Sequence, residues 1–195
     1  MGELEDYSGG LISGSTDPQM LLRYFSKEAL ARLLSQVNRL YLRLSGDYEN
    51  TITRRWGSDV SFECTVEAWD EHCPFNKESI CRTLNIEGND VEAYFKYMQI
   101  NPGLGLLYPM EWDLRSPNYG IMTVTRCISL EYFERTGQDE YIRKCCGPDG
   151  FEWHGFNLAA RLFHPGMKVT ALKNPPRESK DEIACRWEVK LELDS

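Results

Sequence analysis

The sequence predicts an α+β fold in which a helical N-terminal half precedes two β-hairpins with helices between them. Three observations lead to this prediction. Apolar residues recur with helical spacing over the first hundred residues, and two later segments alternate strictly between apolar and polar residues. Turn residues separate the members of each alternating pair. The simplest arrangement of two such hairpins is a four-stranded antiparallel sheet.

The clearest helical pattern follows Ser26, a plausible N-cap for the segment 27–44. Its apolar residues fall at i, i+3, i+4, i+7, i+10, i+11 and i+14, which predicts a helix with one buried stripe. Gly46 is expected to end this helix and Gly57 the next one. A third helix is expected to close before Pro74, and Asp90 to cap another that ends before Pro102.

Residues 106–114 and 120–127 form the first predicted hairpin, and Pro109 places its first strand at an edge because proline cannot donate to a ladder. Short helices are expected near 130–135 and 139–144, followed by a helix over 151–163. The second hairpin joins 168–173 to 184–193, whose alternation buries one face and places Cys185 on it.

The domain organisation follows from length and composition. With 195 residues, one domain is the default, and we expect it at 26–195, with its helical half at 26–100 and its sheet-containing half at 101–195. Residues 1–25 are rich in Gly, Ser and acids, which predicts a mobile arm.

Charge and cysteine usage narrow the class of protein. The net charge of −8 argues against a nucleic-acid partner and disfavours an anionic membrane surface, and no apolar run approaches a membrane span. Seven cysteines, an odd number without a basic signal peptide, favour reduced thiols in the cytoplasm. We therefore expect a cytoplasmic protein with a small-molecule partner, and a homodimer through the helical half is a further expectation.

The candidate chemistry lies between Arg126 and Trp187. Cys146 is the expected nucleophile, Asp149 or His154 the expected base, and Asp149 could instead cap the following helix. Cys127, Cys146 and Cys185 could converge as ligands of zinc or another divalent metal, or Cys127 and Cys185 could simply pack the core. Four aromatic residues could line an apolar ligand pocket, or belong to the core: Tyr108, Trp112, Trp153 and Trp187.

These residues carry a family resemblance. The order Arg126-Cys127-Ile128, Cys146-x-x-Asp149, a helix, and Cys185-Arg-Trp-Glu-Val resembles the L-2-amino-thiazoline-4-carboxylate hydrolase family and related uncharacterised cytosolic proteins. The likeness extends over about Ser26 to Leu193, and more distantly the C-terminal half resembles ligand-binding domains of the 4-vinyl reductase type. The resemblance implies that the uncharacterised cytosolic relatives carry a cysteine just before the Pro-Pro loop, where this chain has Leu172-Lys173-Asn174 before Pro175-Pro176.

The resemblance implies a hydrolase that opens a cyclic amidine by adding water across a C=N bond, with Cys127, Cys146, Asp149 and Cys185 at the matching positions. A second hypothesis is a non-catalytic small-molecule-binding or sensor module whose cysteines hold zinc or pack the core. A third is an interaction subunit that docks a partner through the Leu30–Leu44 helix, for which an exposed apolar patch would be the sign.

Overall fold

The computed structural model describes residues 22–23 and 25–192. The chain divides into two compact units, Met1–Asp47 and Tyr48–Ser195, and the division falls within a single long helix, α2 (Lys27–Trp56). The arm expected at residues 1–25 lies outside the described residues except for 22, 23 and 25. The predicted boundary at residue 25 therefore stays a prediction.

The first two helices are longer than the sequence pattern predicted. Helix α2 continues through Gly46, and α3 (Ser58–Leu84) continues through Pro74, so both expected ends are wrong. A glycine inside a helix costs only about 1 kcal/mol, which the good helix formers on either side can offset. Pro74 costs more, but the buried side chains of Cys73 and Asn76 hold this part of α3 in place. The chain breaks instead at Gly57, whose φ of 94° suits glycine.

Helix α4 (Val91–Gln99) follows its predicted cap. The Asp90 carboxylate accepts a hydrogen bond from the Ala93 N–H at 2.9 Å, which satisfies one of the free amides of the first turn. Its inner face is buried, including Tyr94 and Phe95. The predicted helix and its start are confirmed.

The C-terminal half forms one four-stranded antiparallel sheet. Its strands are β1 (Met110–Ser116), β2 (Tyr119–Val124), β3 (Met167–Lys173) and β4 (Cys185–Leu191), in the spatial order β1-β2-β4-β3. This confirms the α+β prediction and places β1 at an edge, as Pro109 indicated. Strand β1 begins after this proline rather than at Leu106, because the preceding residues form turns in which the Tyr108 N–H binds the Leu104 carbonyl.

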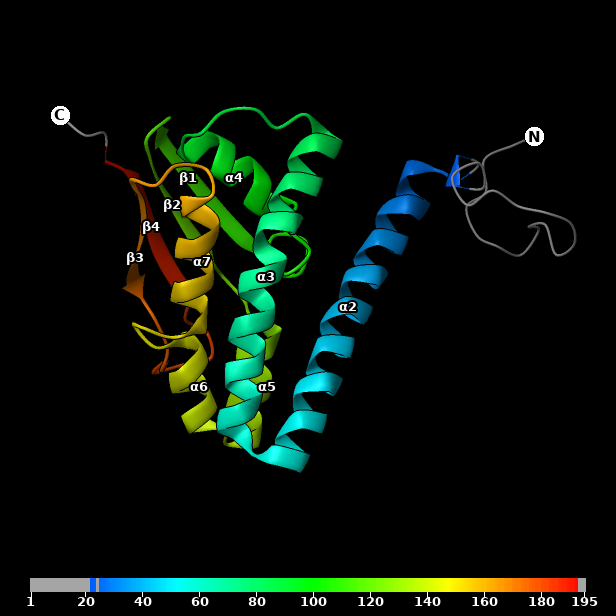
Figure 1. Cartoon of the computed structure of the whole chain (residues 1–195), viewed down its shortest axis with the longest axis vertical. Helices are drawn as coiled ribbons and strands as arrows, with labels where there is room; N and C mark the ends of the chain where they lie inside the picture. Colours follow the sequence, from blue (N-terminus) through cyan, green and yellow to red (C-terminus); the bar gives the residue numbers. More distant parts are fainter. Residues whose placement is uncertain (1–21, 24, 193–195) are drawn as a thin grey trace, which may run out of the picture. The chain divides into compact units, whose positions relative to one another are not determined.

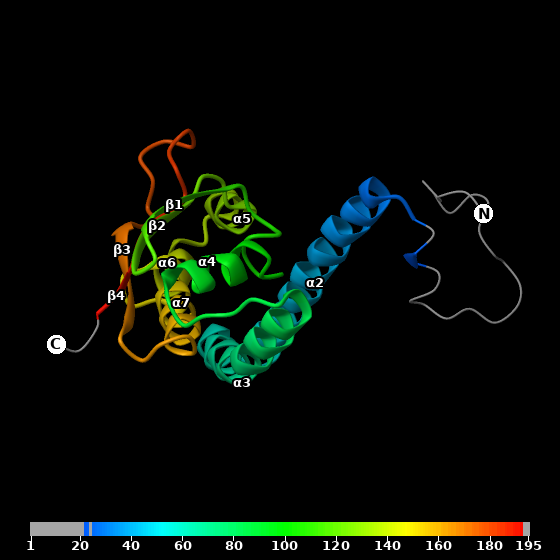
Figure 2. The same ribbon diagram turned by 90° about the horizontal axis from the view of Figure 1, so that it is seen from above.

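Three helices connect the hairpins: α5 (Ile128–Thr136), α6 (Asp139–Cys146) and α7 (Phe151–Arg161). Within this unit the helices lie on one side of the sheet (Figures 1 and 2). Alternate residues of β4 are buried, and Trp187 at the centre has no exposed surface and meets Phe156 of α7 edge-on, with ring centroids 5.0 Å apart. The core therefore lies between the sheet and the helices, and Cys185 starts on its inner face.

No helix among residues 22–23 and 25–192 combines the length and the apolar character needed to cross a membrane.

Candidate functional site

Three cysteines meet where the sheet, α5 and α6 come together. Cys185 is the first residue of β4 and pairs in register with Val124, the last residue of β2. Cys127 follows β2 directly, and its thiol caps α5 by accepting the Leu130 N–H at 3.4 Å. Cys146 ends α6, and all three cysteines are buried. The convergence expected from the sequence is therefore a feature of the structure.

A tight turn joins Cys146 to α7. A Cβ at Gly147 would lie 2.3 Å from the Arg143 carbonyl oxygen, and one at Gly150 would lie 2.7 Å from the Cys145 carbonyl oxygen. Such contacts are shorter than any side chain tolerates, so glycine at both positions allows the start of α7 to approach the end of α6 closely. The first turn of α7 then carries Glu152 toward Cys146.

Glu152 interacts electrostatically with all three of these cysteines. Desolvation of its carboxyl raises its pKa from 4.5 to about 7, and a hydrogen bond with the Cys146 thiol opposes part of that rise. The residue as a whole is partly buried, whereas its carboxyl is desolvated. Its negative form raises the pKa of Cys127, Cys146 and Cys185. We call Cys127, Cys145, Cys146, Cys185 and Glu152 the thiol–glutamate cluster.

The thiols of this cluster are protonated at neutral pH. Burial, followed by the charge of Glu152, raises the pKa of Cys127 to about 11. Burial raises the pKa of Cys145 to about 12 and that of Cys146 further still. Because the thiolate is the nucleophilic form, none of these groups is activated in this arrangement, and Glu152 is the group that titrates near neutrality.

The two residues predicted to act as bases lie apart from this arrangement. Asp149 is exposed on the turn, and Gly150 rather than Asp149 is the N-cap of α7, with no side chain capping it; the cap interpretation is therefore wrong. His154 points to α3, where its Nε2 lies 2.5 Å from Asp70 Oδ1. The structure thus groups Cys146 with Glu152 and groups His154 with Asp70.

The four predicted aromatic residues are divided between the cluster and the core. Tyr108 lies beside Cys127 and its hydroxyl is 2.9 Å from the Ser129 hydroxyl. Trp112 packs edge-on against Phe95, and Trp153 is partly buried against the core. Trp187 is fully buried.

The predicted metal ligands are close together without forming a ligand set. Within the described part of the chain, no three His, Cys, Asp or Glu side chains are arranged to hold a metal ion. The chemistry that the cluster supports as it stands is proton transfer by Glu152.

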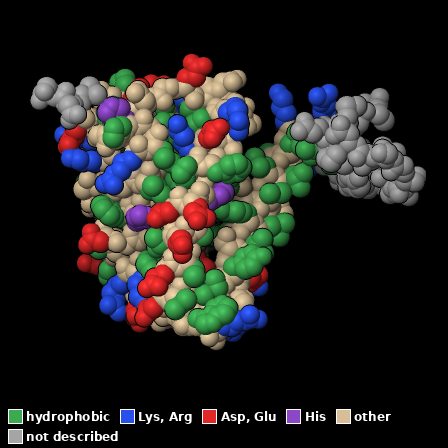
Figure 3. Space-filling model, viewed as in Figure 1, with side chains coloured by type: hydrophobic (Ala, Val, Ile, Leu, Met, Phe, Trp, Pro, Cys, Tyr) green, Lys and Arg blue, Asp and Glu red, His purple; other side chains and the backbone are tan. Residues whose placement is uncertain are grey.

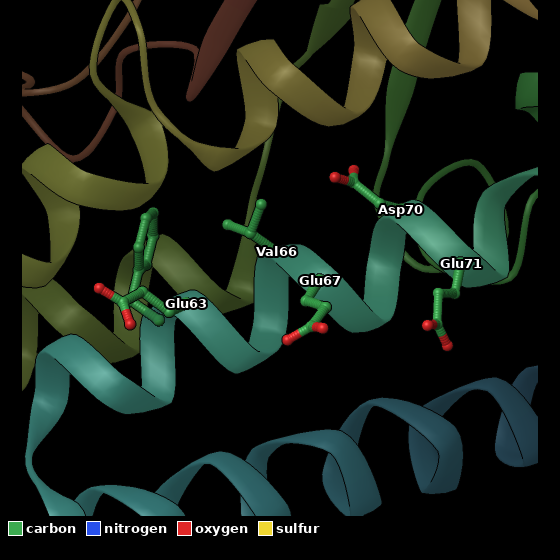
Figure 4. Close-up of a pocket in the computed structure, with 6 residues that line it drawn as sticks. Glu63, Val66, Glu67, Asp70 and Glu71 are labelled. Carbon is green, nitrogen blue, oxygen red and sulfur yellow. The ribbon is translucent and has the colours of Figure 1, made fainter.

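A separate open groove of about 530 Å³ lies on α3, away from the predicted residues. Phe62 and Val66 supply its apolar lining and four carboxylates its polar lining: Glu63, Glu67, Asp70 and Glu71. Asp70 points toward α7, while Glu67 and Glu71 point to the other side of α3 (Figure 4). Asp70 of this groove contacts His154, one of the residues predicted to act as a base.

Comparisons with known proteins return nothing that resembles this chain: no family model, no curated protein and no solved structure matches it.

Sequence reasoning missed Glu152. The signal available was its position, two residues after Gly150 in the first turn of a helix that follows a cysteine. That position was overlooked because Asp149, three residues after Cys146, offered a nearer carboxylate.

Proposed function

We propose that the protein is a hydrolase acting on a C–N bond of a small molecule, with Glu152 as its acid–base group. The observation that carries the proposal is the pKa of about 7 for a carboxyl hydrogen-bonded to Cys146. A general acid–base group is most effective when its pKa lies near the working pH. The resemblance to amino-thiazoline carboxylate hydrolases supports a cyclic amidine as the substrate class.

The proposed reaction adds water across a C=N bond. The Glu152 carboxylate removes a proton from water as the water oxygen bonds to the amidine carbon. The π electrons of the C=N bond move to nitrogen, which takes the proton from the Glu152 carboxylic acid. The residue returns to its carboxylate form and then takes the hydroxyl proton of this tetrahedral adduct as its C–O bond becomes C=O. The bond between that carbon and the ring nitrogen breaks, its electron pair stays on nitrogen, and nitrogen takes the proton from Glu152, so the ring opens and the product contains the atoms of substrate and water.

In this scheme Cys146 does not attack the substrate. Its thiol donates a hydrogen bond to the Glu152 carboxylate and thereby opposes the rise in the carboxyl pKa. Cys127 and Cys185 surround the pair as protonated thiols, and Tyr108 lies next to Cys127. Asp149 and His154 are left out of the reacting set.

The second candidate, a non-catalytic binding module, is favoured by the raised pKa of every thiol in the cluster. Inert, buried cysteines are usual in cores. In that case the thiol–glutamate cluster would bind a small molecule without catalysing a reaction, or would only be part of the packed core.

The test is a pH profile of kcat/KM for hydrolysis of 2-amino-thiazoline-4-carboxylate. We expect a limb with a midpoint near 7, and we expect Glu152→Gln to lower kcat/KM by about 10²-fold or more and to remove that limb. Cys146→Ala should move the midpoint upward, because the hydrogen bond that lowers the pKa of Glu152 is lost. Glu111→Gln, an exposed carboxylate of β1, is the matched control.

Turnover that survives Glu152→Gln unchanged would refute the role of Glu152. Binding of the same compound by calorimetry, without any turnover, would favour the binding module instead.

A further inference from the structure

The thiol–glutamate cluster is almost closed to solvent, so a small molecule reaches it only after part of the chain moves. Cys127, Cys146 and Cys185 are 5 to 7% exposed, and the carboxyl of Glu152 is desolvated. Acidic side chains gather over α3 on the face shown in Figure 3, and their charge repels a carboxylate substrate from that side. Entry from another side of this unit is therefore favoured.

The loop between β3 and β4, residues 174–183, ends beside this cluster. Ala184 follows the loop and precedes Cys185, and its N–H donates to the Val124 carbonyl at 2.9 Å. The loop extends away from the sheet (Figure 2). Among the described residues, the hydrophobic core has no member from the loop. The sheet therefore anchors the ends of the loop, whereas apolar packing does not hold the segment between them.

An ion pair links this loop to α5. The Arg177 side chain is only 2% exposed, and its Nε and Nη2 donate to the two carboxylate oxygens of Glu134 at 3.0 and 2.5 Å. Its Nη1 donates to the loop carbonyls of Lys180 and Glu182 at 3.3 and 3.1 Å. One guanidinium thus holds the loop together and fastens it to α5 through a two-bond pair, the strongest arrangement that arginine makes with a carboxylate.

The fastened loop lies near the cluster. Cys127, Leu130 and Glu134 follow one another at i, i+3 and i+7, so they share one side of α5, and the first two are buried. The Arg177 guanidinium is close enough to Cys127 for the two groups to interact electrostatically. The loop therefore closes over the side of α5 that carries Cys127.

The first residue of the loop is poorly satisfied in this closed position. The Nδ2 and Oδ1 atoms of Asn174 are both buried, and neither has a hydrogen-bond partner among residues 22–23 and 25–192. A buried amide without partners is unfavourable, and contact with water relieves the cost. Asn174 therefore favours opening of the loop, whereas the Arg177–Glu134 pair favours closure.

We propose that residues 174–183 form a lid over the thiol–glutamate cluster, and that separation of Arg177 from Glu134 opens it to a small molecule. The lid rests on the cluster being the site proposed above. It serves the hydrolase and the binding module alike, because both need a route into the cluster.

The test measures how fast 4,4′-dithiodipyridine modifies each cysteine of the full chain as urea is raised below the unfolding transition, with the modified residues identified by tandem mass spectrometry. Opening of the lid exposes little surface, so the rates at Cys127 and Cys185 should depend only weakly on urea. Cys73 of α3 is fully buried and serves as the internal control. It should react only through global unfolding, with a steep urea dependence.

Two variants release the lid in different ways. Glu134→Gln leaves the Arg177 charge without its partner, and Arg177→Met removes that charge, so the second variant tests the lid even where the first does not fold. Each should raise the rates at Cys127 and Cys185 by about tenfold or more relative to Cys73. Glu131→Gln breaks the exposed pair with Arg126 on the same helix and should leave these rates within about twofold.

Rates at Cys127 and Cys185 that follow the rate at Cys73 at every urea concentration would overturn the lid, and so would rates that neither variant changes. Turnover of 2-amino-thiazoline-4-carboxylate by a chain that opens only globally would overturn the lid and leave the hydrolase intact. Weak urea dependence at Cys127 without any turnover would support the lid and count against the hydrolase.

Discussion

Helices α7 and α2 are both amphipathic, but only α7 lies wholly within the unit Tyr48–Ser195, whose other elements pack against its apolar side. The apolar side of α7 is buried, with Phe156, Ala159 and Ala160 among its enclosed residues. Helix α2 is almost three times as long, yet only Ala29 and Asn38 are buried on it. Periodicity therefore shows that a helix has an apolar face, but it does not show whether the same molecule covers that face.

The largest effect expected from this comparison concerns the core beneath α7. Trp187→Ala removes a fully buried side chain and its contact with Phe156, so it should lower the free energy of unfolding by about 3–5 kcal/mol. Leu34→Ala on α2, measured in the same way by urea denaturation, should change it by less than about 0.5 kcal/mol. Equal losses would mean that α2 is as well packed as α7, and the comparison would fail.

A smaller effect concerns pH and isolates Glu152. Its pKa is about 7 in the folded chain, against the ordinary value of 4.5 for a solvated glutamate in the unfolded chain, so the folded state binds the proton more tightly. Stability then falls as the pH rises from 4.5 to 7 and levels off above it, by about 3 kcal/mol in all. Glu152→Gln should remove this dependence, so the variant should be more stable than the natural chain at pH 8 and similar to it at pH 4.5.

The measurement is the free energy of urea unfolding at pH 4.5, 6, 7 and 8 for both proteins. Other carboxyls titrate in both chains, so only the difference between them reports on Glu152. A constant difference across the range would contradict the raised pKa.

The smallest of the three effects compares two buried asparagines. Asn157 of α7 donates to the Val169 carbonyl and accepts from the Val169 N–H, both at 3.0 Å, and so satisfies the outer edge of β3. Asn38 of α2 is also buried, but its amide nitrogen has no hydrogen-bond partner among residues 22–23 and 25–192.

Asn157→Ala leaves both Val169 groups unpaired and should cost about 2 kcal/mol, whereas Asn38→Ala breaks no such bond and should cost less than about 0.5 kcal/mol. Thermal unfolding of the two variants under identical conditions provides the comparison. A larger loss at Asn38 would indicate a hydrogen bond that α2 makes and the structure does not display.

Much of the fold was predictable because local patterns determine it. The alternation in β4, the edge position of β1 and the cap at Asp90 all follow from side-chain chemistry within a few residues. The helix ends at Gly46 and Pro74 were wrong because local breakers can be outweighed by the rest of a long helix. The burial of the apolar stripe expected on the helix after Ser26 stays a prediction, because periodicity shows that a helix has an apolar face but not what covers it.

The cysteines of the candidate site could be predicted from the sequence, but Glu152 could not. Cys127, Cys146 and Cys185 were placed at the ends of predicted elements, and antiparallel pairing of β2 with β4 explains why the first and last of them meet. The pKa of Glu152, by contrast, depends on desolvation by segments distant in sequence. Asp149 also carries a carboxyl group and lies only three residues before Glu152, but it is exposed to solvent on the turn between α6 and α7.

The turn between α6 and α7 also gives the site a short linear signature. Gly147 and Gly150 cannot take a side chain without displacing one helix end from the other, so they hold the distance between Cys146 and Glu152. Cysteine, glycine, two residues, glycine, one residue and glutamate thus encode the thiol–carboxyl pair in consecutive sequence. A search for this string, followed by a strand beginning Cys-x-Trp, can find other chains with the same pair even where overall sequence similarity has disappeared.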